Sequence, residues 1–224
     1  MNETILSVDT THEFGSLALW RAGELVDEVP LHSPEGYGHV LYGHLARLLE
    51  RHGVRVGEVD CFAAASGPGS FTGVRVGLAC VKGLAEACGR PVVAVSNLRA
   101  IASFGTLARR AALLDARRGE IYGAVYDAAG AVLAPETVAP FPAWIAGLAE
   151  GEIEFLSPNV EPFRAALAAT RFATAPLTPV PRALAAAIGR IAVDQLRAGC
   201  TADAAAIDAN YVRHSDAELL WKDR

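Results

Sequence analysis

The sequence predicts an α/β chain in which one structural plan occurs twice, and three observations support this. An apolar run at residues 5–8 ends at Asp9, and a second strand-like stretch follows at residues 14–20 before a turn and a third strand. The same order returns at residues 111–114, which end at Asp115, and in the stretches after them. Each copy then changes to helical periodicity that alternates with short apolar runs. A chain of two related lobes therefore accounts for the pattern.

The elements of the first copy follow from periodicity and from capping residues. A helix is expected at residues 37–52 and a buried strand at residues 59–65. The next helix is expected at residues 70–88, because Ser70 is a good N-cap and apolar residues recur behind it at helical spacing. A strand at residues 91–95 completes this half.

The second copy shows the same succession. Its strands and helices are expected at residues 111–114, 121–126, from 132, 142–149, 153–156, 160–169 and 182–197. A turn at residues 127–130 separates the second strand from the third, as the turn at residues 21–24 does in the first copy. Two copies of one plan are therefore predicted from end to end.

A three-strand meander followed by strand–helix units, present twice, is typical of a duplicated ribonuclease-H-like (actin-like ATPase, ASKHA) fold. This is an α/β architecture of two lobes with mixed sheets and flanking helices. The lobes are expected at residues 1–100 and 101–224, the second with a C-terminal tail. Asp9 and Asp115 would then lie at matching strand ends that face a cleft, where such folds place nucleotide phosphates and metal. Without the repeat, an aspartate at a strand end is more often an ordinary turn former.

Composition limits the setting in which the chain acts. No apolar run approaches the roughly 18 residues that span a membrane, and no signal peptide is visible, so a cytoplasmic protein is expected. The four cysteines lack CxxC spacing and lie in apolar patterns, which favours reduced, buried thiols over disulfides or zinc ligation.

The charge pattern bears on nucleic-acid binding. A net charge of −5 argues against a chain that grips nucleic acid alone, since phosphate contacts need clustered cations. Arg109, Arg110, Arg117 and Arg118 form the only local basic concentration in the sequence. We interpret them as the solvated ends of a hairpin.

A glycine-rich loop at residues 66–75 joins a predicted strand to a predicted helix, whose unpaired N–H groups favour an anion. The loop lacks the Lys-Ser/Thr of a Walker motif, and Thr72 stands where a dinucleotide fingerprint needs glycine. A tight turn before a well-capped helix explains the spacing equally well. The candidate nucleotide- or anion-binding residues are Asp9, Thr10, Gly67, Gly69, Ser70 and Thr72.

Four motifs resemble those of the TsaB (YeaZ) family and occur in the family's order over nearly the whole chain. They are Val8-Asp9-Thr10-Thr11, residues 66–75 (SGPGSFTGVR), residues 115–122 (DARRGEIY) and Tyr211-Val212-Arg213 with Asp216-Ala217-Glu218. The resemblance implies a bacterial cytosolic subunit of actin-like fold that is not itself catalytic. In the second lobe, the motif residues Asp115, Arg117, Glu120 and Tyr122 would line the cleft.

The resemblance also implies partners. Such a subunit works with a larger paralogous catalytic subunit (TsaD-like) and a further ATPase subunit (TsaE-like). Together they install threonylcarbamoyl on the adenosine beside the anticodon of tRNA, which is contacted mainly through the partners. Whether the isolated chain is a homodimer, and whether ATP or ADP binds at the partner interface, is left open. No membrane contact is implied.

The residues themselves agree with a chain that has no catalytic or metal site. His39 and His44 are five residues apart, so on a helix they diverge by about 140° and cannot easily share a metal. No His-Glu-x-x-His motif occurs, and no nucleophile elbow frames Ser70, which leaves hydrolase chemistry without visible machinery.

The partner surface is expected on the helix at residues 70–88. Its apolar stripe should face its own sheet, whereas a second stripe of small residues would let a partner helix approach closely. The residues assigned to the partner are His39, Phe71, Gly73, Arg75, Gly77 and Cys80. The alternative is an independent actin-like ATPase or phosphotransferase that uses Asp9 and Asp115 around a magnesium-bound nucleotide. It is weakened because His12-Glu13, not a glycine-rich turn, follows the first aspartate.

Overall fold

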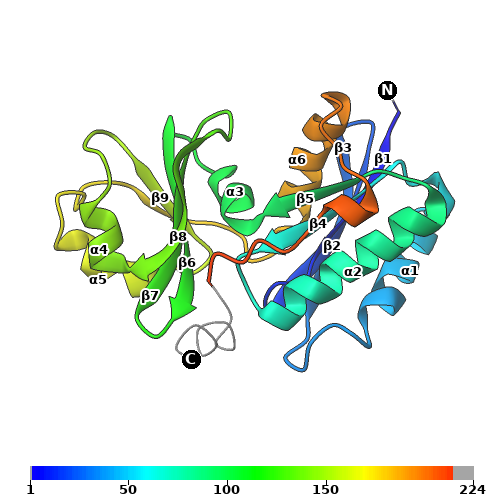
Figure 1. Ribbon diagram of the computed structural model, residues 1–224, viewed down its shortest axis with the longest axis horizontal. Coiled ribbons are helices and arrows are strands. Elements are labelled where there is room, and N and C mark those ends of the chain that lie inside the picture. The colour runs from blue at the N-terminus through cyan, green and yellow to red at the C-terminus, as the bar shows by residue number, and fades with distance from the viewer. Residues whose placement is uncertain (1, 214–224) are drawn as a thin grey trace, which may run out of the picture. The chain divides into compact units, whose positions relative to one another are not determined.

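The computed structural model describes residues 2–213, which form two compact units (Figure 1). Unit 1 contains the chain up to Ala100 and residues 181–209, and unit 2 contains residues 101–180 and the segment from Asn210. The expected change of lobe after residue 100 coincides with this division. The return of residues 181–209 to unit 1 was not expected.

Unit 1 is built on a five-stranded mixed sheet in the order β3-β2-β1-β4-β5. The first three strands, β1 (Thr4–Asp9), β2 (Phe14–Arg21) and β3 (Glu24–His32), form an antiparallel meander. The parallel strands β4 (Cys61–Gly67) and β5 (Val92–Ser96) extend the sheet from β1. β1 is therefore central, and its residues are buried on both faces of the sheet.

Helices cover both faces of this sheet. α1 (Leu41–Arg51) and α2 (Phe71–Cys88) pack on the face that Leu6 and Val8 share, where they form one hydrophobic core with β2 and β4. Because side chains alternate along a strand, Ser7 points to the opposite face. That face is covered by α6 (Ala185–Arg197), as Figure 1 shows.

α6 was predicted as a helix of the second lobe, and the structure instead packs it on the first sheet. The hydroxyl of Ser7 donates to the carbonyl of Ala185 at 2.7 Å, and the amide of Ala185 donates to Ser16 Oγ at 2.9 Å. Gly189 lies so close to Trp20 that a β-carbon there would overlap the indole ring. Local periodicity fixes the helix but carries no information about which sheet receives it.

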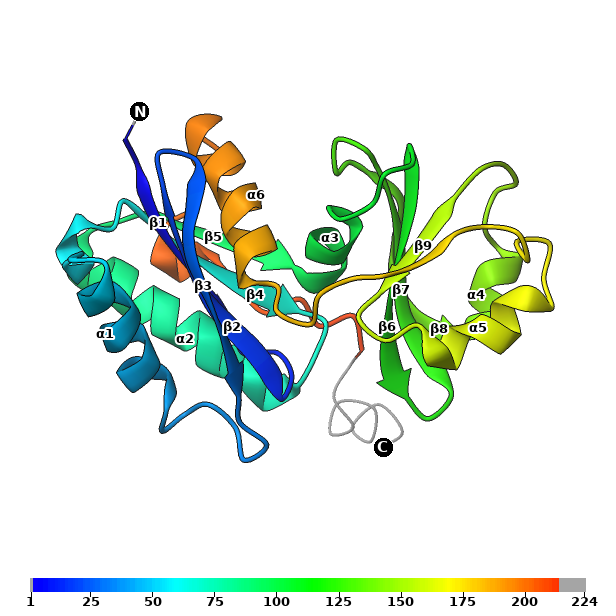
Figure 2. The same cartoon turned by 180° about the vertical axis from the view of Figure 1, so that it is seen from behind.

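Unit 2 repeats the topology in a second five-stranded sheet of order β10-β9-β6-β7-β8, which Figure 2 shows from behind. Its strands are β6 (Arg109–Arg117), β7 (Glu120–Asp127), β8 (Val132–Pro140), β9 (Glu154–Ser157) and β10 (Leu177–Pro179). As in unit 1, the first three strands are antiparallel and the last two are parallel to the first. This confirms the predicted duplicated ribonuclease-H-like fold.

The helices of unit 2 are short. α4 (Phe141–Ala146) and α5 (Glu161–Ala168) bury aromatic residues against the sheet, among them Phe141, Trp144 and Phe163. No helix within residues 2–213 is long and apolar enough to cross a membrane.

Some elements begin elsewhere than predicted. α1 begins at Leu41 rather than near residue 37, because Tyr37 is buried and its hydroxyl is bound to the β1–β2 hairpin. That hydroxyl accepts from the amide of Gly15 at 2.6 Å and donates to the carbonyl of Glu13 at 2.7 Å. The short helix α3 (Asn97–Ala102), the strand β10, and the 3₁₀ turns at Val56–Glu58 and Ala204–Ala206 were not predicted.

Candidate functional site

The turn after β1 carries the first candidate residues, and hydrogen bonds within the turn hold it. Asp9 is fully buried. Its Oδ1 atom accepts from the amide of Thr11 at 2.9 Å and from the hydroxyl of Thr11 at 2.7 Å. Its Oδ2 atom is buried without a hydrogen-bond partner among the described residues, and the Nε2 atom of His12 lies 3.9 Å from it. Asp9 thus shapes the turn as an acceptor of local hydrogen bonds.

The glycine-rich loop and the start of α2 pack directly against this turn. The hydroxyl of Thr10 donates to the carbonyl of Gly73 at 2.7 Å, and the amide of Ser70 donates to the carbonyl of Thr11 at 2.6 Å. A β-carbon on Gly69 would lie 2.6 Å from the Thr11 carbonyl oxygen, and one on Gly73 would overlap the Thr10 carbonyl oxygen. These glycines are needed because two backbone segments touch.

Asn97, the first residue after β5, joins the same two segments, and no pattern in the sequence pointed to it. It is fully buried at the start of α3. Its amide donates to the hydroxyl of Thr11 at 2.7 Å, and its Oδ1 atom accepts from the amide of Gly67 at 3.0 Å. We call Asp9, Thr10, Thr11, Asn97 and the loop residues 67–73 the turn–loop lock.

The lock uses several of the loop amides that the predicted anion site would need. The amides of Gly67 and Ser70 are already hydrogen-bonded inside the unit, and the amide of Gly73 is capped by Ser70 Oγ at 3.2 Å. Asp9, Thr10 and Gly67 are buried, whereas Gly69, Ser70 and Thr72 are exposed. The alternative of a tight turn before a capped helix is the one this geometry favours.

The residues around Asp9 also fit a metal-bound nucleotide poorly. Magnesium takes several oxygen ligands, and Asp9 could offer only its enclosed Oδ2 atom. Within the part of the chain that the structure describes, no three His, Cys, Asp or Glu side chains are grouped to hold a metal. His39 lies in the turn before α1, not on the helix that carries His44.

The corresponding hairpin of unit 2, between β6 and β7, is exposed and differently held. Asp115 is exposed, and its Oδ1 atom accepts from the amide of Arg117 at 2.8 Å. Arg213 braces the hairpin, because it donates to the carbonyl of Ala116 at 2.8 Å, pairs with Glu120, and lies 5.7 Å above the ring of Tyr122. The structure thereby joins the third and fourth motifs; Asp216 and Glu218 lie outside the described residues.

The outer surface of α1 and α2 carries large apolar side chains among small ones. Tyr42 on α1 is 58% exposed and Phe71 on α2 is 44% exposed. Arg75 stacks over the Phe71 ring at 3.6 Å. Gly43 and Ala46 on α1 and Ala79 and Gly83 on α2 are exposed as well. We call this surface the α1–α2 face.

The partner stripe that the sequence analysis selected on α2 is partly wrong. Gly77 and Cys80 are buried, and a β-carbon on Gly77 would lie 2.6 Å from Thr10 Oγ1. Gly73 and Gly77 therefore serve the turn–loop lock, since they let β1 approach α2. Phe71 and Arg75 are exposed as expected. The small residues of α2 that are exposed are Ala79 and Gly83. They also recur at helical spacing, but spacing does not show which of the two small-residue stripes is buried.

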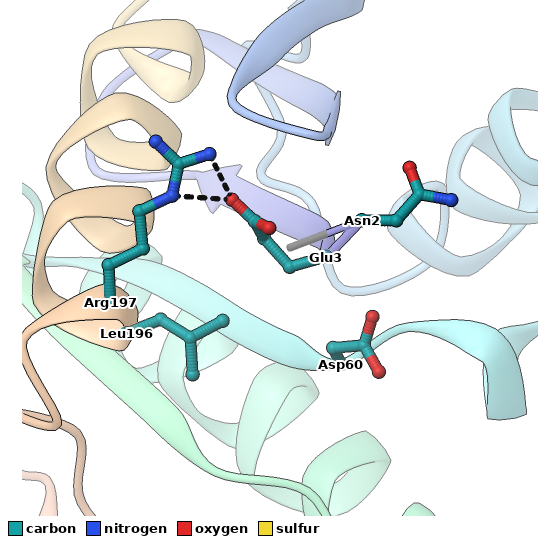
Figure 3. A pocket seen from close by; sticks show the side chains of 5 residues that line it. All are labelled: Asn2, Glu3, Asp60, Leu196 and Arg197. Atoms are coloured by element: carbon teal, nitrogen blue, oxygen red, sulfur yellow. Dashed lines mark hydrogen bonds and ion pairs between the residues drawn. The ribbon is translucent and has the colours of Figure 1, made fainter.

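One cavity of unit 1 lies at the opposite end of β1 from Asp9 (Figure 3). It measures about 370 Å³ and is lined by Asn2, Glu3, Asp60, Leu196 and Arg197. Arg197 Nε donates to Glu3 Oε1 at 2.7 Å, and Asp60 Oδ2 accepts from the amide of Thr4 at 2.9 Å. Burial opposes ionisation of Glu3, but its backbone hydrogen bond and Arg197 outweigh burial and lower its pKa. Ligands of α/β sheets bind at the carboxyl ends of strands, so the function of the chain is not assigned to this cavity.

Comparison with known proteins decides the family. Residues 29–215 match the family described as TsaD: tRNA N6-adenosine threonylcarbamoyltransferase. The structure of YeaZ from Pseudomonas aeruginosa superposes with a TM-score of 0.80 at 27% identity, over 93% of this chain and 99% of that one. The chain belongs to the TsaB (YeaZ) family, within this TsaD-type domain family.

Sequence relatives agree with this assignment. The tRNA threonylcarbamoyladenosine biosynthesis protein TsaB of Escherichia coli is 34% identical over 127 residues, which are 55% of this chain and 54% of that protein. An uncharacterized protein of Mycobacterium tuberculosis is 31% identical over 190 residues, 80% of this chain and 90% of that protein. The chain thus spans about half the length of the curated TsaB proteins that it matches.

Proposed function

We propose that the chain is a non-catalytic subunit in the biosynthesis of threonylcarbamoyladenosine on tRNA, and that it binds a larger related catalytic subunit through the α1–α2 face. The pathway is the one named for its TsaB relatives. The observation that carries the proposal is the α1–α2 face itself. Exposed Tyr42 and Phe71 accompany exposed small residues on these two helices.

The α1–α2 face suits the packing of helices from a partner. Nothing lies within 4 Å of a β-carbon built on Gly83, and only the end of the Arg47 side chain approaches one on Gly43. Small residues let helix axes approach closely, and aromatic residues with arginine supply much of the energy of protein interfaces. Phe71 and Arg75 provide such a pair beside the open positions. The same face would serve self-association of the isolated chain.

The turn–loop lock supports a role without chemistry. An independent ATPase or phosphotransferase would need Asp9 available to a nucleotide-bound metal, yet its Oδ1 atom holds Thr11 and its Oδ2 atom is enclosed. Two loop amides that could contact a phosphate, those of Gly67 and Ser70, are used by Asn97 and Thr11. We therefore propose that any ATP or ADP binds with the help of partners, among them a further ATPase subunit.

The test is the mass in solution of the chain mixed with its larger paralogue, compared between two substitutions on one helix. Gly83→Leu should leave the chain folded, because the position is open and leucine favours a helix by roughly 1 kcal/mol over glycine. It should abolish or greatly weaken the complex, because a large side chain then stands where a partner helix must approach.

Gly77→Leu is the matched control. The same substitution should lower the melting temperature strongly, since the side chain would meet Thr10 inside the unit. A wild-type chain that stays separate from the paralogue at micromolar concentration would contradict the proposal. So would a Gly83→Leu chain that forms the complex as well as the wild type.

A further inference from the structure

The cavity at the amino end of β1 contains a buried carboxylate oxygen that lacks a hydrogen bond. Glu3 is only 7% exposed, and its Oε2 atom has no hydrogen-bond partner within residues 2–213. Arg197 places two nitrogens on the other oxygen, Oε1, with Nε at 2.7 Å and Nη2 at 2.5 Å. Arginine more often pairs with both oxygens of a carboxylate. Because buried polar atoms are nearly always hydrogen-bonded, the bare Oε2 atom requires an explanation.

The unbonded oxygen is turned toward the cavity. In Figure 3 both dashed lines from Arg197 end on one oxygen of Glu3, and the second oxygen points to the side where Leu196 and Asp60 lie. The guanidinium group is held where it is, because a β-carbon built on Gly23 would lie 2.5 Å from Arg197 Nη2. Arg197 is thus fixed between Glu3 and the β2–β3 turn, and Oε2 is left to a group inside the cavity.

The size of the cavity suits a small solute. It measures about 370 Å³, whereas one water molecule occupies about 30 Å³ in the liquid. Binding sites for small molecules begin at about 300 Å³. The side chains of Asp60 and Arg197 in its wall are 38% and 41% exposed, so the cavity is open to solvent. A solute larger than water can therefore reach Oε2.

The charges of the wall favour a cation over an anion. Two carboxylates line the cavity with a single guanidinium group, and that group is bound to Glu3. Asp60 Oδ1 lies 3.4 Å from an Arg90 nitrogen, which is longer than the usual hydrogen bond and leaves this oxygen able to accept another. Leu196 supplies an apolar surface beside the charges. A metal ion fits less well, since no three His, Cys, Asp or Glu residues of the described chain are grouped to hold one.

We propose that this cavity binds a primary ammonium group carried on a short aliphatic chain. The ammonium donates hydrogen bonds to Glu3 Oε2 and to the carboxylate of Asp60, and its carbon atoms lie against Leu196. An ammonium group has three donors and no acceptor, which matches a site made of carboxylate oxygens. The site is separate from the α1–α2 face, so the failure of this proposal and the failure of the proposed function are independent.

The test is a titration of the isolated chain with n-butylamine at pH 7 and constant ionic strength, followed by the NMR signals of the Leu196 methyl groups. A saturable shift is expected with n-butylamine and not with butyrate or n-butanol, which have the same chain without the positive charge. A lysine side chain of another protein offers the same chemistry. An acetylated and amidated Ala-Lys-Ala peptide is therefore titrated in parallel, and its affinity relative to n-butylamine separates a protein side chain from a free amine.

Two variants locate the site. Glu3→Gln keeps an acceptor for Arg197 but puts an amide N–H group in place of Oε2, and should weaken binding about tenfold or more, as expected for the loss of a charged hydrogen bond. Leu196→Phe fills the space, removes no charge, and should weaken binding as much at a similar melting temperature. Glu161→Gln is the control, because it removes an exposed carboxylate from α5 and should change nothing.

Three results would overturn the proposal. The first is the absence of a saturable shift in the wild type up to about 10 mM n-butylamine, which would mean that the cavity holds water only. The second is equal affinity for n-butanol, which would show an apolar hollow without selectivity for charge. The third is unchanged binding of n-butylamine to folded Leu196→Phe and Glu3→Gln chains, which would place the amine elsewhere on the protein.

Discussion

Asp9 is the last residue of β1 and Asp115 lies near the end of β6, in two units with the same strand order. Asp9 is fully buried, and the turn behind it is enclosed by α2 and Asn97. Asp115 is exposed, and Arg213 braces the hairpin behind it. In unit 1, the turn after the first strand is an internal joint. In unit 2, the corresponding turn carries two arginines.

The difference shows that a repeated fold does not preserve the use of a repeated residue. A carboxylate at a turn accepts hydrogen bonds from the turn whether it is buried or exposed. The residues packed around it decide whether it is buried. Three glycines of unit 1, Gly69, Gly73 and Gly77, allow the close approach that buries Asp9. In the described part of unit 2, no long helix corresponds to α2, and the aspartate of its hairpin is exposed to solvent.

The largest expected difference between the units is the stability lost when a glycine is replaced by alanine. Gly73→Ala should destabilise the chain by about 3 kcal/mol, because the new β-carbon would overlap the Thr10 carbonyl oxygen. Gly119→Ala should cost only about 1 kcal/mol, because its surroundings are open and only the positive φ opposes it. Gly83→Ala is the control and should stabilise slightly. Denaturant unfolding measures all three, and equal losses at Gly73 and Gly119 would contradict the comparison.

Substitutions of the residues that hold each hairpin should differ less in the stability that they remove. Asn97→Ala should cost about 2 kcal/mol, since it leaves the amide of Gly67 and the hydroxyl of Thr11 buried without their partner. Arg213→Ala should cost about 1 kcal/mol, because Ala116 and Glu120 can turn to water instead. A larger loss for Arg213→Ala than for Asn97→Ala would show that unit 2 depends on its brace more than we infer.

Two glutamates, Glu28 of unit 1 and Glu154 of unit 2, should also respond oppositely to pH. Burial opposes ionisation of Glu154 in unit 2, but hydrogen bonds from Thr178, Thr106 and the amide of Leu107 outweigh it and lower its pKa. Its contribution to stability is present above its unfolded pKa and is lost as pH falls through the lower folded pKa. Burial raises the pKa of Glu28 in unit 1, so its contribution is full below its unfolded pKa and is lost as pH rises through the higher folded pKa.

Glutamine substitutions test these signs. Glu154→Gln should reduce the loss of stability as pH falls below the ordinary pKa of glutamate. Glu28→Gln should reduce the loss of stability as pH rises above that pKa. The free energy of unfolding in urea, measured from about pH 3 to pH 7, gives both slopes. Two variants with slopes changed in the same direction would contradict the assignment.

Much of the fold was predictable, because hydrophobic periodicity repeats with the topology. What the sequence could not provide were contacts between distant segments. The start of α1 depends on the Tyr37 hydroxyl bound at Gly15, and the position of α6 depends on Ser7 and Trp20. Motifs in the sequence drew attention to the glycine-rich loop and to Asp9 and Asp115, but the contacts of Asn97 and Arg213 join segments far apart in the chain and could not be predicted. Spacing identified two stripes on α2 without showing which small residues face the turn of Asp9.

We propose that the buried turn of unit 1 is a structural joint and not a site of nucleotide chemistry. The most direct measurement is ATP turnover by the purified wild-type chain alone, beside Asp9→Asn and Asp115→Asn, with thermal melts of all three. We expect no turnover above background in any of them. We also expect the mixture with the larger paralogue to keep threonylcarbamoyl transfer when Asp115→Asn replaces the wild type. Steady ATP turnover by the wild type, abolished by Asp9→Asn at unchanged melting temperature, would contradict the account.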